Sequence, residues 1–349
     1  MSDQSSPKPA RRPRYSGTHP RQFNEKYKEL NAGRYTDEVA KIVASGKTPA
    51  GTHRPVLLNE VLHVLRPKPG QLVADATLGF GGHAQELLLA VQPGGKLFGV
   101  DLDPIELPKT EVRLRALDVP AKAIVLRRSN YAGLTKWLAQ QAPDGVDMVL
   151  ADLGCSSMQL DNPERGFGYK VDGPLDMRMN PEHGQSAAAL LDKLTDIQLA
   201  KIFRDYSDEP HAHALAQAIL QAHHKHPLTT KSLADLVNAT ARRLPQAIGD
   251  DPATSVPRVF QALRIAVNDE FAALEAFLAS VPYVLKPGGR VAVISFHSGE
   301  DRRVKQAFKQ GLKDGVYASI APDIITPGAE ERHANPRSKS AKMRWAVRS

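Results

Sequence analysis

Between residues 71 and 151, short apolar runs alternate with stretches of helical periodicity, and this alternation restricts the fold more than any other feature of the chain. Strands separated by helices pair side by side through crossover connections, which produce a parallel sheet with helices on its faces. The predicted strands are Gln71–Ala76, Lys96–Val100, Ala123–Leu126 and Asp147–Ala151. The sequence therefore predicts an α/β fold.

The alternation then stops for about a hundred residues. The segment 160–255 opens with a glycine- and proline-rich loop and continues as helices such as Asp196–Arg204 and Ala212–His223. The strand pattern resumes after a helix near Phe260–Val284, with a strand at Arg290–Phe296 that follows the turn Lys-Pro-Gly-Gly. We interpret the interruption as a helical insertion.

Further segments complete the predicted organisation. Apolar residues at helical spacing predict helices at Pro55–Leu65 and His83–Ala90, and Lys342–Val347 suits a last strand. We therefore expect residues 51–159 and 256–349 to form one α/β domain around the helical insertion.

Charge makes nucleic acid a plausible partner without proving it. The chain holds 46 Lys and Arg against 38 Asp and Glu, a formal net charge of +8. Residues 1–50 are polar and basic, and they read as a flexible N-terminal extension. Two roles stay open for this extension, which are contact with RNA phosphates and no role beyond solvation.

Cysteine content excludes two kinds of small structural site. Cys155 is the single cysteine, so neither an intrachain disulfide framework nor a cysteine-rich zinc site can form. No signal-peptide pattern and no bilayer-spanning apolar stretch are visible, and we expect a cytoplasmic protein. No metal is expected either, because no standard zinc spacing is formed by His211, His213, His223, His224 and His226.

A glycine loop follows the first predicted strand. Gly79, Gly81 and Ala84 fit the spacing G-x-G-x-x-G/A, which lets the backbone turn sharply and approach a ligand closely. Asp101 ends the second predicted strand, where a carboxylate can accept the hydroxyls of a ribose. These features alone fit either NAD or S-adenosylmethionine (AdoMet).

Acidic residues favour the second ligand. Asp75 ends the first predicted strand and Asp152 follows the fourth, so Asp75, Asp101 and Asp152 should meet at one edge of the sheet. AdoMet carries an ammonium and a sulfonium, which carboxylates attract, whereas a pyrophosphate would be repelled. An AdoMet site that includes Asp75, Gly79 and Asp101 is therefore predicted.

Several longer segments resemble one family, the RsmH (MraW) family of ribosomal RNA small subunit methyltransferases. The resemblance runs from about residue 53 to the C-terminus. Its most specific stretches are Asp152–Asp161 (DLGCSSMQLD) and Pro174–Met179 (PLDMRM). The other matching segments are His53–Leu57, Asp75–His83, Arg165–Phe167, Arg264–Asn268, Ser295–Arg302 and Asn335–Ala341.

The resemblance implies a class I, Rossmann-like AdoMet-dependent methyltransferase with a helical inserted domain that binds the RNA substrate. It implies methylation of the exocyclic N4 of cytidine 1402 in bacterial 16S rRNA, with the small ribosomal subunit as partner and no membrane. Monomer and homodimer stay open. The implied AdoMet contacts are Gly81, Gly82, His83, Asp101, Tyr131, Asp152 and Gln159.

Residues near the target base are hypotheses. Asp152, with Ser156 or Ser157, is the candidate that lies nearest the target amine, although helix capping explains the serines equally well. The candidates for holding RNA are Arg165, Phe167, Arg178 and His297. For the two arginines, ion pairs with Asp161, Asp172 or Asp176 are an equal alternative, and a structural role is the alternative for His297.

Two other functions compete with methyl transfer. An NAD-dependent oxidoreductase would use the same glycine loop but leaves the segments DLGCSS and PLDMRM unexplained. A noncatalytic RNA-binding assembly factor would keep the fold and bind rRNA without turnover.

Overall fold

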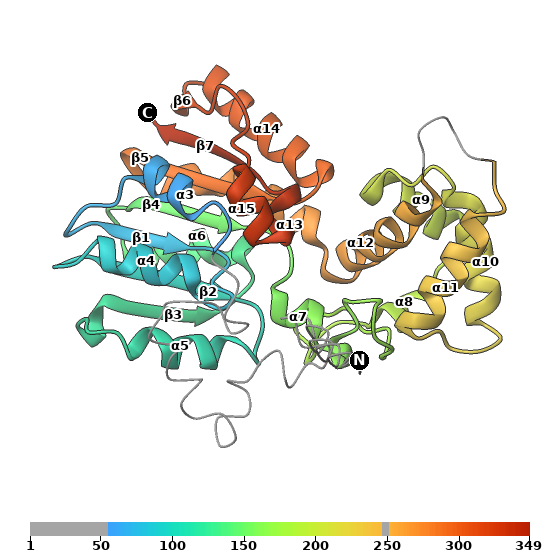
Figure 1. Cartoon of the computed structure of the whole chain (residues 1–349). Coiled ribbons are helices and arrows are strands. Elements are labelled where there is room, and N and C mark those ends of the chain that lie inside the picture. The colour runs from blue at the N-terminus through green and yellow to red at the C-terminus, as the bar shows by residue number, and fades with distance from the viewer. Residues whose placement is uncertain (1–54, 246–250) are drawn as a thin grey trace, which may run out of the picture.

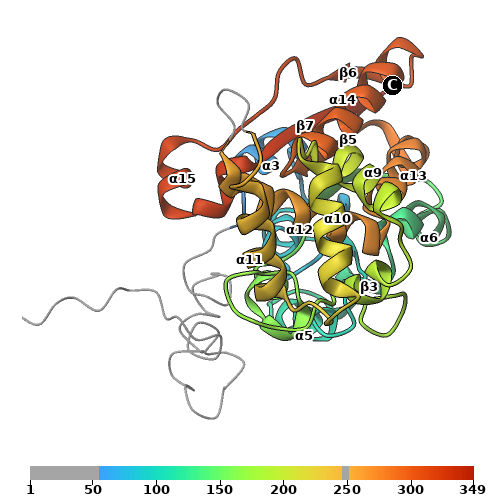
Figure 2. The same ribbon diagram turned by 90° about the vertical axis from the view of Figure 1, so that its right-hand side faces the viewer.

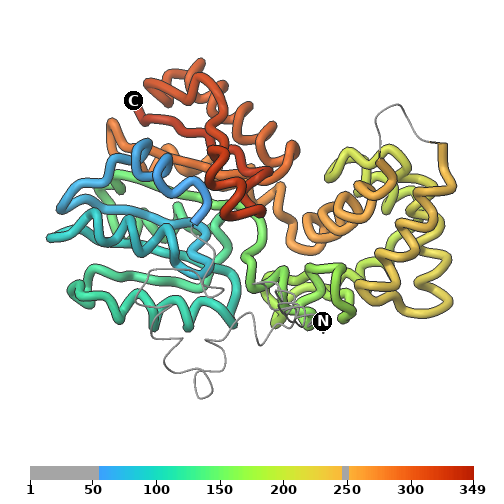
Figure 3. Tube along the Cα trace, in the orientation of Figure 1, coloured from blue at the N-terminus to red at the C-terminus, as the bar shows by residue number. Residues whose placement is uncertain are grey.

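The structure, a computed structural model, describes residues 55–245 and 251–349. The predicted N-terminal extension, residues 1–50, lies outside these ranges. The described chain forms a sheet lobe and a helical lobe (Figure 1). The tube in Figure 3 shows one passage into the helical lobe after β4 and one return before α13.

A seven-stranded sheet forms the first lobe, in the order β3-β2-β1-β4-β5-β7-β6. Strands β1 to β5 are parallel, and β7 runs antiparallel to both β5 and β6. The strands are β1 Leu72–Asp75, β2 Lys96–Asp101, β3 Ile124–Arg128, β4 Val146–Asp152, β5 Leu285–Ser295, β6 Tyr317–Ile320 and β7 Lys342–Arg348. This topology confirms the predicted α/β, Rossmann-like class I fold.

Helices cover both faces of the sheet, and each face has its own apolar core. Successive strand residues point to opposite faces, so Val73 joins one core and Ala74 the other. One face is covered by α3 (Leu58–Leu65), α4 (Gly82–Ala90) and α5 (Leu107–Arg115). The other is covered by α6 (Leu134–Gln141), α13 (Glu270–Ser280) and α14 (Ser298–Lys313).

The helical lobe has a third, separate core. Figure 2 shows this lobe turned towards the viewer, with α9, α10 and α11 in front of the sheet lobe. Its helices are α8 Ala187–Leu191, α9 Asp196–Ser207, α10 Ala212–His223, α11 Thr230–Ala241 and α12 Ser255–Asn268. Short elements at its border with the sheet lobe are α7 Ser157–Asp161 and η4 Pro163–Arg165.

The structure corrects three element predictions. The helix expected at Phe260–Val284 is two helices, because the chain turns sharply at Asp269, where φ is 50°. The first of them, α12, packs in the core of the helical lobe, so helical packing extends beyond residue 255. Strand β6 was not predicted, since it has four residues and lies at the edge of the sheet.

Two smaller findings concern the ends of elements and the membrane. Helix α3 begins at Leu58 and not at Pro55 as predicted, whereas α10 has the predicted bounds. In the part of the chain that the structure describes, no helix is both long and apolar enough to cross a bilayer.

Candidate active site

A cavity of about 550 Å³ lies at the carboxyl ends of β1, β2 and β4. Its walls include the glycine loop, the segments after β2 and β4, η7 (Pro336–Ser340), and Met179 and Asn268 from the helical lobe. Ligands of open parallel sheets bind at this edge. The predicted cofactor contacts that line the cavity are Gly79, Gly81, Gly82, His83, Asp101, Tyr131, Asp152 and Gln159.

The glycine loop has the backbone conformation that its residues predict. Gly79 and Gly81 have φ of 49° and 88°, in the left-handed region that favours glycine. A Cβ on Gly81 would lie 2.8 Å from Cγ2 of Thr110, so a side chain has no room there. Gly81 caps the N-terminus of α4, whose first amides therefore face the cavity region.

Asp101, at the end of the neighbouring strand β2, holds the glycine loop in place. Its carboxylate accepts hydrogen bonds from the amides of Gly79, at 2.6 Å, and Asp103, at 2.8 Å. Burial raises the pKa of Asp101 to about 6, although both amide hydrogen bonds oppose the shift. A carboxylate held in this way is rigid, and its remaining lone pairs are available to hydroxyl donors.

Asp75 lies beneath the loop and does not line the cavity. Its carboxylate accepts the amide of Thr77 at 3.0 Å. Burial raises the pKa of Asp75 to about 7, and the charge of Asp101 adds to this effect. We therefore correct the predicted direct ligand contact of Asp75, because the side chain is enclosed by the first strand and its own turn.

Asp152 and His83 face each other through one carboxylate oxygen and one ring nitrogen. The Nε2 atom of His83 lies 2.9 Å from the carbonyl of Val56, which only accepts, so Nε2 carries the proton. Burial lowers the pKa of His83 to about 4, which leaves Nδ1 with a lone pair at neutral pH. That atom lies 3.5 Å from Oδ2 of Asp152.

The other carboxylate oxygen of Asp152, Oδ1, is buried and has no hydrogen-bond partner within residues 55–245 and 251–349. Burial raises the pKa of Asp152 well above its usual range, and the charges of Asp75 and Glu300 add to the shift. The end of β4 thus holds a buried carboxyl oxygen that has no partner among the described residues. Such a site suits a cation or an N–H group.

The serines after Asp152 have different surroundings. The hydroxyl of Ser156 accepts the amide of Gln159 at 3.2 Å, and the side chain of Gln159 accepts the amide of Ser156, which makes a capping box. This geometry supports the capping alternative for Ser156. Ser157 begins α7, and both serines line the cavity.

Tyr131 lines the cavity from η3 (Tyr131–Gly133), which follows β3. Its hydroxyl donates to the carbonyl of Glu270 at 3.2 Å, and its ring meets Phe277 edge to face at 5.8 Å. Both contacts fix the ring, so it can present one surface to a planar ligand.

Arg165 and Phe167, two predicted RNA contacts, are buried. Arg165 pairs with Asp103 at 2.8 Å and is 7% exposed, while Phe167 belongs to the core of the helical lobe and is 5% exposed. Side chains this buried cannot hold RNA, so this prediction is wrong for both residues. Asp103, the partner of Arg165, is not one of the three carboxylates that were suggested from the sequence.

The other two predicted RNA contacts are engaged with acidic neighbours. Arg178 pairs with Asp176 at 2.6 Å, which was one of the suggested alternatives, and it stays partly exposed. His297 does not line the cavity, and its Nε2 lies 3.3 Å from Oε1 of Glu300, against the ring of Phe271. The structure thus favours the structural role for His297.

Sequence reasoning gave no role to several polar residues that line the cavity. Arg264 makes a two-point ion pair with Glu270, with distances of 2.8 and 2.9 Å. Glu300 accepts the amide of Phe296 at 2.8 Å; although burial opposes its ionisation, the nearby His297 and Arg264 hold its pKa below the usual value. Arg264 and Glu300 lie in segments that resemble the family, but no rule on residue spacing predicts a function for them.

Comparisons with known proteins identify the family of the chain. A model of the MraW methylase family matches residues 50–349. Ribosomal RNA small subunit methyltransferase H 2 of Alkaliphilus metalliredigens is 45% identical over 350 residues, covering 99% of this chain and all of that protein. The corresponding H 1 protein of Lachnoclostridium phytofermentans is 43% identical, covering 97% of this chain and 93% of its own.

Alignment to the Alkaliphilus protein includes nearly the whole chain and hence most of the basic N-terminal extension. Among solved structures, a SAM-dependent O-methyltransferase from Thermotoga maritima aligns at 10% identity with a TM-score of 0.38, covering 85% of this chain and 67% of that one. A likeness this remote says nothing about the chemistry of this chain. The family match and the two curated relatives suffice, and the chain belongs to the MraW methylase family.

Proposed function

We propose that this protein methylates the exocyclic N4 of a cytidine in 16S rRNA, with AdoMet as methyl donor, and that the cytidine is the one numbered 1402. Relatives with 43–45% identity are named ribosomal RNA small subunit methyltransferases H. The observation that carries the proposal is the buried Oδ1 of Asp152, which has no partner among the described residues and belongs to the cavity that the Asp101 carboxylate also lines.

The residues of the cavity fit AdoMet. The carboxylate of Asp101 would accept the ribose hydroxyls, the backbone of Gly81 and Gly82 permits close approach, and Tyr131 offers a ring for the adenine. The acidic groups would attract the ammonium and sulfonium and would repel the pyrophosphate of NAD. When bound, AdoMet supplies an activated methyl group on sulfur.

Methyl transfer forms an N4–carbon bond, breaks the sulfur–carbon bond and leaves one proton to remove from N4. The lone pair of N4 is delocalised into the cytosine ring, so the protein must orient the amine as well as accept its proton. Asp152 in its ionised form would do both, because its Oδ1 lacks a hydrogen-bond partner among the described residues and lines the cavity.

The test is a methylation assay with labelled AdoMet and small subunits reconstituted with unmodified 16S rRNA transcript. Nucleoside digestion and mass spectrometry should reveal N4-methylcytidine, and a transcript with uridine at position 1402 should stay unlabelled. Label in another base, or at another atom of the same cytidine, would refute the proposed specificity. Binding of AdoMet and rRNA without any transfer would instead indicate a noncatalytic assembly factor.

A further inference from the structure

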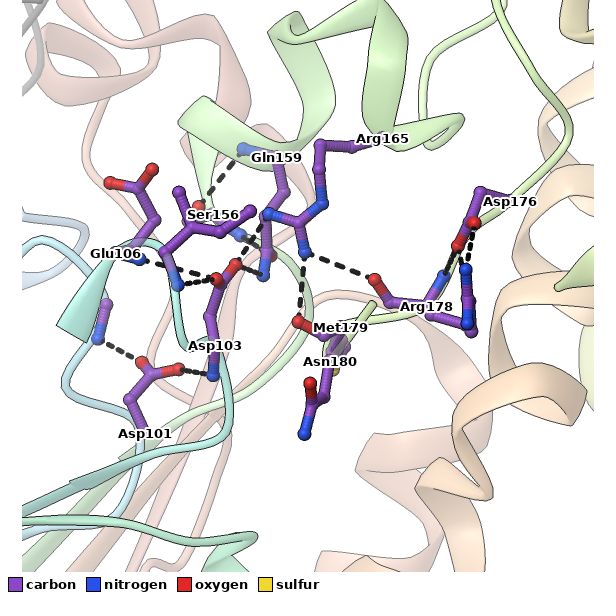
Figure 4. A network of polar contacts seen from close by, with 12 residues as sticks. Asp101, Asp103, Glu106, Ser156, Gln159, Arg165, Asp176, Arg178, Met179 and Asn180 are labelled. Atoms are coloured by element: carbon purple, nitrogen blue, oxygen red, sulfur yellow. Dashed lines mark hydrogen bonds and ion pairs between the residues drawn. The ribbon is translucent and has the colours of Figure 1, made fainter. Parts of the chain in front are cut away.

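We propose that Arg165 is a positioning residue that couples the cofactor subsite to the RNA-binding side of the cavity. The inference rests on the proposed function, since it assigns the two sides of the cavity to AdoMet and to the target nucleotide. Figure 4 shows the network that carries it, with the Asp103 carboxylate between Gln159 and Arg165.

The guanidinium of Arg165 joins three segments of the chain. Its Nη1 donates to Oδ2 of Asp103 at 2.8 Å. Its Nη2 donates to the carbonyls of Arg178 and Met179, at 3.1 and 2.9 Å. Arg165 and Asp103 are buried, at 7% and 1% exposed, whereas Arg178 and Met179 are partly exposed. The side chain therefore acts inside the protein.

On the cofactor side, Asp103 is tied directly to Asp101. The amide of Asp103 donates to Oδ1 of Asp101, and the Oδ2 of Asp103 also accepts the side-chain amide of Gln159 at 2.8 Å. Asp101 and Gln159 are both predicted AdoMet contacts that line the cavity. A ligand held by these two groups thus acts on the carboxylate that holds Arg165.

On the other side, Arg165 and Asn268 hold one strained segment between them. Met177 is buried with φ of 64°, a conformation that costs a non-glycine residue free energy and needs support from its surroundings. Its amide donates to the carbonyl of Arg165 at 3.0 Å, and its carbonyl accepts the side chain of Asn268 at 2.7 Å. Asn268 also accepts the amide of Met179 at 2.7 Å.

Met179 and Asn268 line the cavity from the helical lobe, so the position of this segment shapes the wall that faces the cofactor residues. The planar fork of arginine reaches the carboxylate with one nitrogen and the two carbonyls with another, in a fixed geometry. Lysine keeps the charge but has a single nitrogen. Arg165→Lys should therefore keep the ion pair with Asp103 and lose the hydrogen bonds to the carbonyls of Arg178 and Met179.

The experiment measures RNA affinity with and without S-adenosylhomocysteine, the demethylated product form of AdoMet. In the wild-type protein we expect the ligand to tighten binding of unmodified small subunits at least about fivefold, the lower end of ordinary allosteric coupling. Arg165→Lys should reduce this factor to about one, while each ligand alone still binds. By thermodynamic reciprocity, RNA should increase the affinity of the protein for S-adenosylhomocysteine by the same factor.

Arg302→Lys is the matched control. Arg302 makes an arginine pair between the lobes outside the cavity, with Asp208 at 3.1 Å, and it is half exposed. Its coupling factor should equal that of the wild type. Full coupling in Arg165→Lys, or equal loss in both variants, would overturn the assignment.

A second measurement does not depend on a folded variant. In the wild-type protein, S-adenosylhomocysteine should slow hydrogen exchange of the Met177 amide, which bonds to the Arg165 carbonyl and not to the ligand residues. Unchanged exchange with saturating ligand would contradict the coupling. Absence of ligand binding in calorimetry would instead contradict the proposed function, so the two failures are distinguishable.

Discussion

At the scale of single residues, buried acidic groups mark the cavity region: Asp101 and Asp152 line the cavity, and Asp75 lies beneath its glycine loop. Burial raises the pKa of all three, because the hydrogen bonds that Asp75 and Asp101 accept do not make up for the lost water. Perturbed groups that cluster in a cavity are typical of functional sites. A cationic ligand supplies the missing charge.

Cofactor affinity should depend on the ionisation of Asp101. Its pKa of about 6 means that below pH 6 a proton must leave before the carboxylate can accept two hydroxyls. We expect the affinity for S-adenosylhomocysteine, measured by calorimetry, to fall up to about tenfold per pH unit below this point. In Asp101→Asn affinity should be lower throughout, without the decline centred near pH 6; an unchanged pH profile would exclude Asp101.

Asp152→Asn should separate binding from chemistry. The amide keeps the shape of the side chain but accepts no proton, so we expect methylation to slow by about a hundredfold or more. Ser156→Ala is the control, because Ser156 caps α7. It should cost about 1 kcal/mol of stability and leave kcat unchanged. Single-turnover rates and thermal melts test both, and a near-normal rate in Asp152→Asn would contradict the assignment.

Asp75→Asn should stabilise the ligand-free protein at high pH. The folded pKa of about 7 exceeds the ordinary value of 3.8, so the folded state binds more protons between these values. Its stability therefore falls as pH rises through that window. Asparagine cannot ionise, so the melting temperature of the variant should exceed that of the wild type at pH 8 and match it near pH 4. A variant that melts lower at pH 8 would contradict this account.

At the scale of elements, the segment after β4 is held by close backbone contacts as well as by Arg165. Gly166 follows η4 with φ of 71°, and a Cβ there would lie 2.4 Å from the carbonyl oxygen of Pro174. Gly184 has a similar φ of 78°, but a Cβ would meet nothing within 4 Å. Alanine at either glycine would suffer backbone strain, but only alanine at Gly166 would also suffer a steric clash. Comparing the two substitutions therefore separates the two costs.

Gly184→Ala should cost about 1–2 kcal/mol, the penalty of a left-handed residue with a Cβ. Gly166→Ala should cost about 1–3 kcal/mol more, because the backbone near Pro174 must move as well. Denaturant titration of both variants measures the difference. Equal losses would mean that the segment has room to shift.

At the scale of the whole molecule, the lobes meet at the cavity and at further contacts outside it. Asp208, at the end of α9, accepts from Ser298 and Arg302 of α14, and Tyr206 meets Phe271 edge to face at 5.2 Å. The Asp208 pair is half exposed and contributes at most about 1 kcal/mol. The buried pair of Arg165 and Asp103 is the stronger tie, because breaking it leaves a buried charge.

Ligand binding should therefore stabilise both lobes together. S-adenosylhomocysteine at a hundred times its Kd should add about 2.7 kcal/mol. In scanning calorimetry we expect a single unfolding transition that moves upward as a whole. Two transitions, one of them unaffected by the ligand, would show that the cavity residues of the helical lobe do not couple the unfolding of the two lobes.

Local sequence patterns determined much of this protein, and tertiary structure decided the rest. The five parallel strands, the glycine loop and α10 were predictable, because periodicity and backbone freedom depend on neighbouring residues. The break at Asp269 and the edge strand β6 were not, since either conformation suits those residues locally.

The candidate site divides in the same way. The carboxylates at strand ends were predictable, because parallel strands bring their carboxyl ends to one edge. The partners of Arg165 and Met177 lie 62 and 91 residues away along the chain, so only the packing of the two lobes selects them. The sequence of a loop does not indicate whether an arginine in it contacts RNA or a buried carboxylate. Only the fold determines that its side chain is buried.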